Sequence, residues 1–119
     1  MEDLTRAMTL NFRAYQNDMF DYVFSVNRSD SGVAYPLNGK VVKMDIKKQY
    51  DKNAETVKQL DLTEGLSVGG AANNEITFDF IIDFPAGNYV YDIETSEQDF
   101  SNKRTVCRGA IEVINDITK

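Results

Sequence analysis

The sequence predicts an all-β sandwich of seven or eight antiparallel strands in one domain. Several stretches alternate apolar and polar residues with a period of two, which is the period of a half-buried strand. Turn-forming residues recur about every 8 to 12 positions, a spacing typical of sandwiches rather than of βαβ units. Seven Phe and six Tyr also favour a β-rich core. A chain of 119 residues buries roughly two thirds of its unfolded surface, which suffices for one core.

The first half divides into an arm and three strands. We expect residues 1–8 to form an N-terminal arm and residues 9–119 to form a single sandwich domain. Residues 1–7 lack strand periodicity, so the arm is expected to be frayed or docked on a neighbouring protein. A first strand is expected to begin at Met8, a central strand to cover residues 19–26, and a further strand to cover residues 42–47.

The second half begins with an ambiguous stretch. Residues 55–62 fit neither the strand nor the helix period, and we predict a short edge strand there, with a helix as the alternative. Further strands are expected over 66–68 and 76–82. The last strand runs from residue 103 to about 114, and Gly109 within it indicates a bulge or a close backbone approach.

A turn between two strong strands contains Pro85, Gly87, Tyr89 and Tyr91. Proline fixes φ and has no amide proton, and glycine accepts a positive φ at little cost, so a tight corner is expected. The spacing resembles the tyrosine corner of immunoglobulin-like sandwiches, in which a tyrosine bonds backward to the backbone just upstream. Tyr89 would be that residue. Tyr91 would occupy the place of the second disulfide cysteine of such domains.

The composition argues against most enzymes. The chain has no His and one Cys, so Cys-His dyads, Ser-His-Asp triads and the usual zinc sites cannot be built within it. This removes most hydrolases, and the sequence offers no catalytic, cofactor-binding or metal-binding residues. The net charge of −6 opposes nucleic-acid binding, and no segment has the length and hydropathy of a membrane span.

Paired carboxylates and the single thiol have simpler structural explanations. Asp92 with Glu94, and Asp79 with Asp83, are pairs that a solvated strand face commonly carries, and nothing in the sequence indicates a pocket that would shift their pKa values. Cys107 is expected to be a buried small apolar residue or to lie in a reducing compartment.

Three residues are candidate assembly contacts. Phe100 is the one aromatic residue in the polar loop 94–102, where it would either anchor an interface or fold back over the end of the sandwich. Leu4 and Met8 are the apolar candidates in the arm.

The order of these landmarks resembles small immunoglobulin-like domains of tailed-phage virion proteins, including the N-terminal domain of phage baseplate upper proteins. The resemblance spans roughly residues 9–118. It is carried by Asn17–Phe20, Tyr35–Lys47, Asn74–Phe80, the corner Pro85–Ile93 and the closing stretch Arg108–Thr118.

The resemblance implies a non-enzymatic structural protein of a tailed-phage virion, in the tail, the baseplate or attached to the head. It implies docking on other virion proteins, in several copies, after assembly in the host cytoplasm. Because the sequence ends at Lys119, we expect a standalone component. Two alternatives stay open: a module that binds host-surface glycans, and a small phage inhibitor of a host protein whose acidic surface mimics nucleic acid.

Overall fold

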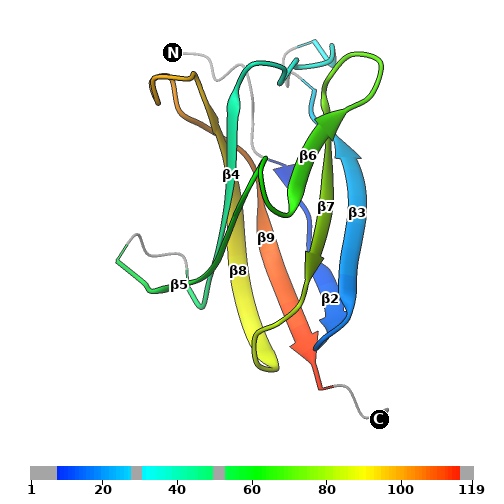
Figure 1. Ribbon diagram of the computed structural model, residues 1–119, viewed down its shortest axis with the longest axis vertical. Coiled ribbons are helices and arrows are strands. Elements are labelled where there is room, and N and C mark those ends of the chain that lie inside the picture. Colours follow the sequence, from blue (N-terminus) through cyan, green and yellow to red (C-terminus); the bar gives the residue numbers. More distant parts are fainter. Residues whose placement is uncertain (1–7, 28–30, 50–52, 116–119) are drawn as a thin grey trace.

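The computed structural model describes residues 8–27, 31–49 and 53–115, and its strands form two facing sheets (Figure 1). None of these residues belongs to a helix that could span a membrane. In chain order the strands are β1 (Met8–Thr9), β2 (Phe12–Tyr15), β3 (Met19–Ser25), β4 (Val41–Lys47), β5 (Thr56–Asp61), β6 (Leu66–Gly69), β7 (Glu75–Ile81), β8 (Gly87–Ser96) and β9 (Arg104–Ile114).

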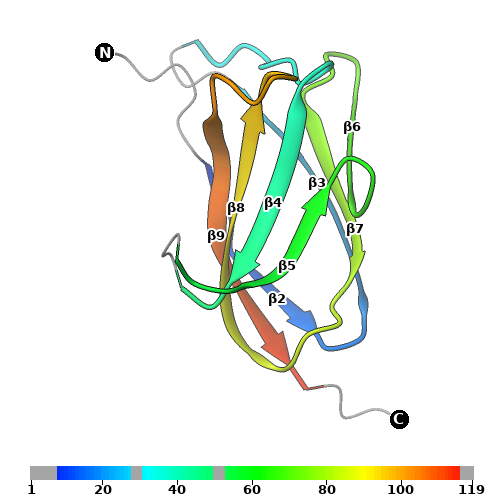
Figure 2. The ribbon, with the colours of Figure 1, turned by 60° about the vertical axis from the view of Figure 1, so that its left-hand side comes forward.

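The larger sheet has the strand order β1-β9-β8-β4-β5, with β2 also paired to β9, and the smaller sheet has the order β3-β7-β6. Figure 2 shows β9, β8, β4 and β5 side by side in one sheet, with β6, β7 and β3 of the smaller sheet next to them. The predicted all-β sandwich is therefore confirmed. The segment over 55–62 is an edge strand, β5, and not the alternative helix.

The N-terminal strand differs from the prediction in two ways. It consists of two short pieces, β1 and β2, and both run parallel to β9, with Met8 opposite Cys107 and Phe12 opposite Ile111. The sandwich is thus not wholly antiparallel. Met8, which we placed in the arm, is the first residue of β1 and packs against the core. Leu4 and the rest of the predicted arm lie outside the described residues.

Strand β3 is also placed differently. We predicted a central strand over 19–26, but β3 forms the edge of the smaller sheet, and β7 lies at its centre. The inward-facing aromatic residues of β3 gave it the sequence pattern of a central strand. These residues, Phe20, Tyr22 and Phe24, pack against Phe78 of the neighbouring strand.

Phe78 of β7 is the centre of the core. Its side chain is completely buried. Aromatic rings surround it with centroid separations between 5.5 and 6.4 Å, which is the range of favourable edge and offset contacts. They come from both sheets: Phe12, Phe20, Tyr22, Phe24, Phe80 and Tyr91.

Gly109 lets the N-terminal strand approach β9 closely, as its position in the sequence predicts. A Cβ atom at Gly109 would lie 1.8 Å from the carbonyl oxygen of Leu10. The Tyr91 hydroxyl donates a hydrogen bond of 2.7 Å to the same oxygen. Nearby, the side-chain oxygen of Asn11 accepts a bond from the Ala110 amide, in the gap between β1 and β2. Tyr91 therefore ties the first strand to the core.

Candidate docking site

The connection between β8 and β9 presents one aromatic side chain to solvent. Phe100 is 54% exposed and has a φ of 65°. Asn17, Asn73 and Asn102 are the other non-glycine residues with positive φ in the described part of the chain. Asparagine tolerates this conformation, whereas a bulky residue pays about 1 to 2 kcal/mol for it. The Phe100 side chain is therefore exposed over about half of its surface in an unfavourable backbone conformation.

Hydrogen bonds within the connection hold Phe100 in this conformation. The Glu97 amide donates to the Ser101 carbonyl at 3.0 Å, and the Phe100 amide donates to the Glu97 carbonyl at 2.8 Å. The hydroxyl and the amide of Ser101 both donate to the Asp99 carboxylate, which lowers the pKa of Asp99. The loop thus has a defined shape that positions the ring.

The loop that precedes β4 is bonded to this connection. The Lys40 ammonium lies 2.8 Å from a Glu97 carboxylate oxygen, and the Gln98 side-chain amide donates to the Gly39 carbonyl at 2.8 Å. Residues 31–40 and the β8–β9 connection therefore meet at one end of the sandwich, opposite the end that contains the β7–β8 corner (Figure 1). Two anchored loops support the exposed ring.

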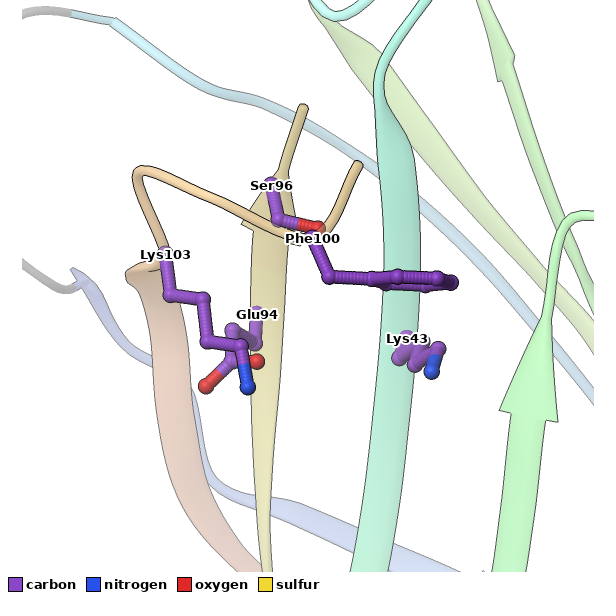
Figure 3. A pocket seen from close by; sticks show the side chains of 5 residues that line it. All are labelled: Lys43, Glu94, Ser96, Phe100 and Lys103. Carbon is purple, nitrogen blue, oxygen red and sulfur yellow. The ribbon is translucent and has the colours of Figure 1, made fainter. Parts of the chain in front are cut away.

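A small cavity of about 200 Å³ lies under the ring on the outer face of the larger sheet. Figure 3 shows the Phe100 ring above Lys43 of β4, with Glu94 and Lys103 to one side. The Lys43 ammonium is 4.7 Å from the centroid of the ring, which is a cation–π distance. The lining residues are Lys43, Glu94, Ser96, Phe100 and Lys103. Aromatic residues are enriched at the core of protein–protein interfaces, so the exposed Phe100 ring is a candidate interface residue.

Of the two carboxylate pairs named from the sequence, Asp92 and Glu94 lie near each other on β8, whereas Asp79 and Asp83 have other neighbours. Asp83 instead bonds Lys58 of β5 at 2.9 Å, and Asp79 lies opposite Asp21 of β3. The sheet register places Asp92 opposite Asp45. Burial, followed by the Asp45 and Glu94 charges, raises the pKa of Asp92.

This Asp45–Asp92 contact was missed because the sequence does not reveal strand register. One oxygen of Asp45 is buried without a hydrogen-bond partner. The described residues contain no group of three or more Asp, Glu or Cys side chains arranged to hold a metal ion. Burial raises the pKa of the Cys107 thiol, which is fully buried in the core. Neither the Asp45–Asp92 pair nor Cys107 lines the cavity at Phe100.

The β7–β8 connection has the geometry expected of a tyrosine corner. The Tyr89 hydroxyl donates a hydrogen bond of 2.5 Å to the Pro85 carbonyl. The Phe84 ring packs edge-on against the Tyr89 ring with centroids 4.8 Å apart, and burial raises the pKa of the Tyr89 hydroxyl. Gly87 has a φ of 153°, within the range that glycine adopts readily.

The corner hydrogen bond can be tested by removing one oxygen atom. Tyr89→Phe is expected to lower the free energy of unfolding by about 1 kcal/mol, because the Pro85 carbonyl loses its donor while the ring packing remains. Chemical denaturation of both proteins measures the difference. An unchanged midpoint would contradict a stabilising role for this bond.

No known protein-family model and no curated protein matches this sequence. Solved structures do match in fold. A chicken TCR aligns with a TM-score of 0.55 and 12% identity, over 91% of this chain and 54% of the receptor chain. An uncharacterised protein from Bacillus anthracis strain Ames aligns at 0.49 with 15% identity, over 92% and 85% of the two chains. The NK cell receptor NKp44 aligns at 0.46 with 11% identity, over 92% and 100%.

The chain therefore has an immunoglobulin-like β-sandwich fold. In the lettering of that fold, β9, β8, β4 and β5 correspond to strands G, F, C and C′, and β3, β7 and β6 correspond to B, E and D. Phe100 thus lies on the F–G loop, and the loop that braces it is the B–C loop. Both loops belong to the end that carries the binding loops in variable domains.

Proposed function

We propose that this chain is a non-enzymatic structural domain of a tailed-phage virion, and that it docks on other virion proteins through its F–G loop. The stretches Tyr35–Lys47, Pro85–Ile93 and Arg108–Thr118, which resemble phage virion domains, support the choice of partner. The geometry around Phe100 supports the choice of surface.

The conformation of Phe100 carries the proposal. A bulky apolar residue that is both exposed and held at positive φ lowers the stability of the free protein in two ways. Such a cost is typical of functional positions, where the binding partner provides the compensating energy. Aromatic anchors that fill a partner's pocket often contribute 2 kcal/mol or more, so one such residue can dominate an interface.

Removing the ring tests the docking surface. Phe100→Ala is expected to reduce incorporation of the chain into virions at least about tenfold, because a loss of 1.4 kcal/mol already corresponds to that factor. The measurement is quantitative mass spectrometry of virions from cells that supply the variant in place of the original chain.

Two further variants separate docking from folding. Phe100→Gly removes the ring and also relieves the backbone strain, so it is expected to lose incorporation while keeping full stability. Leu62→Ala truncates an exposed apolar residue elsewhere and is expected to incorporate normally. Normal incorporation of both Phe100 variants would refute the F–G loop as the docking surface.

The glycan-binding alternative requires aromatic rings aligned on one face. Tyr15 and Tyr22 are the exposed tyrosines of the described residues, and they belong to different sheets, so they do not form such a row.

The third alternative, a small inhibitor of a host protein, differs in location, because an inhibitor remains with its host target when virions are purified.

A further inference from the structure

We propose that the free edge of β3 is a second binding site, which accepts an extended segment of another protein as an added strand. The bound segment would carry Lys or Arg at alternate positions facing outward and apolar residues at the positions facing the core. The surface lies at the edge of the smaller sheet, whereas Phe100 lies on the connection between β8 and β9 of the larger sheet.

The backbone of β3 has no strand of the described residues paired with it along one side. The Val26 amide donates to the Asn74 carbonyl, and the Asp18 carbonyl accepts from the Ile82 amide, so even-numbered residues direct their backbone groups toward β7. Because these directions alternate along an antiparallel strand, the odd-numbered residues direct theirs toward the free edge. These residues are Met19, Asp21, Val23 and Ser25.

In the immunoglobulin fold a further strand pairs with the strand that corresponds to β3. The described part of this chain does not supply that strand. In constant-type domains strand A pairs with strand B in the sheet A-B-E-D. Here the corresponding N-terminal pieces β1 and β2 pair with β9 in the other sheet instead. Among the described residues, no strand therefore pairs with the outer side of β3 along its seven residues, and the next pairing on that side is the bridge from Asn27 to Ala34.

β3 lacks the features that protect the other sheet edges. Strand edges are commonly blocked by lysine, proline, bulges or short length. β6 and β2 have only four residues each, and β5 has a register shift against β4 and contains Lys58. β3 has no basic residue and no proline, and Met19 and Val23 on it are 57% and 51% exposed. An unprotected edge of this length favours strand addition.

The charges beside the edge identify the chemistry of the added strand. On the outer face, Asp21 lies directly opposite Asp79, and Ser25 lies opposite Glu75. Like charges at directly opposed positions destabilise a sheet, so folding alone does not favour this arrangement. A strand with outward Lys or Arg would place its charges beside these carboxylates. A second copy of this chain would instead bring its own Asp21 and Asp79 to the same place.

A pair of synthetic peptides tests the site. We would titrate the full chain with a nine-residue peptide of alternating Lys and Val, and with the matching Glu and Val peptide, using fluorescence anisotropy. The Lys/Val peptide is expected to bind at least about tenfold more tightly than the Glu/Val peptide. Amide hydrogen exchange with bound Lys/Val peptide is expected to slow at Met19, Asp21, Val23 and Ser25, whose amides reach the free edge.

Two variants control for non-specific attraction to an acidic protein. Asp21→Lys is expected to weaken binding of the Lys/Val peptide at least about tenfold, because it reverses the charge nearest the added strand. Glu64→Lys makes the same charge change at an exposed site between β5 and β6 and is expected to have little effect. Equal weakening by both variants would overturn the proposal, as would protection at another edge or equal binding of the two peptides. Protection of β3 amides without peptide, in a concentration-dependent dimer, would assign the edge to a second copy instead.

Discussion

Replacement of Gly109 by alanine is expected to lower the free energy of unfolding by about 3 kcal/mol. The new Cβ would meet the Leu10 carbonyl at 1.8 Å, and backbone atoms cannot move aside as the end of a flexible side chain can. The first strand would separate from β9, and the hydrogen bond from the Tyr91 hydroxyl to Leu10 would break. Urea denaturation followed by circular dichroism measures the loss.

Gly69→Ala is the matched control for this substitution. Gly69 also lies in a strand, and a Cβ there would meet no atom within 4 Å. Alanine in a strand loses less backbone entropy than glycine, so stability is expected to stay equal or to rise by about 0.5 to 1 kcal/mol. If Gly109→Ala were as stable as Gly69→Ala, the close approach of the first strand to β9 would be wrong.

Truncation of Phe78 is expected to have the largest effect on stability, a loss of about 4 kcal/mol. The ring is completely buried and contacts aromatic residues from both sheets, so Phe78→Ala leaves a cavity between the sheets that neither sheet alone can close. Denaturant unfolding again provides the measurement, with near-ultraviolet circular dichroism to follow the aromatic packing.

Phe100→Ala is the control of the same residue type. Its ring is exposed at the end of the sandwich, so the substitution is expected to change stability by no more than about 0.5 kcal/mol. Equal losses at positions 78 and 100 would contradict a core centred on Phe78.

The strands were predictable because their side chains alternate, and alternation reports which face of a strand is buried. It does not report the partner of a strand or its direction. The pairing of Met8 with Cys107 joins residues from the two ends of the chain, and the alternation in either strand is compatible with a parallel or an antiparallel neighbour. For the same reason the edge position of β3 was missed. Its inward aromatic residues are equally suited to a central strand.

The features of the candidate site were predictable to different degrees. Phe100 stands out in the sequence because its neighbours are polar, and Tyr89 stands out by its spacing from Pro85 and Gly87. The positive φ of Phe100 and the bond from Lys40 to Glu97 depend on how two loops meet, which no local pattern encodes. The contact between Asp45 and Asp92 depends on strand register, which local patterns also leave open.

The two proposed surfaces would let one sandwich domain contact two neighbouring proteins at separate places. The F–G loop offers an aromatic anchor on an ordered support, and the β3 edge offers backbone groups beside carboxylates. The two can be disrupted independently, because Phe100 and Asp21 lie on different elements.

The most direct test of the proposed function is a mass-spectrometric inventory of virions purified from cells that express this chain. We predict that the chain is present in the particles at a constant ratio to the other virion proteins from batch to batch. A chain that is abundant in the lysate but missing from the purified particles would contradict the virion assignment.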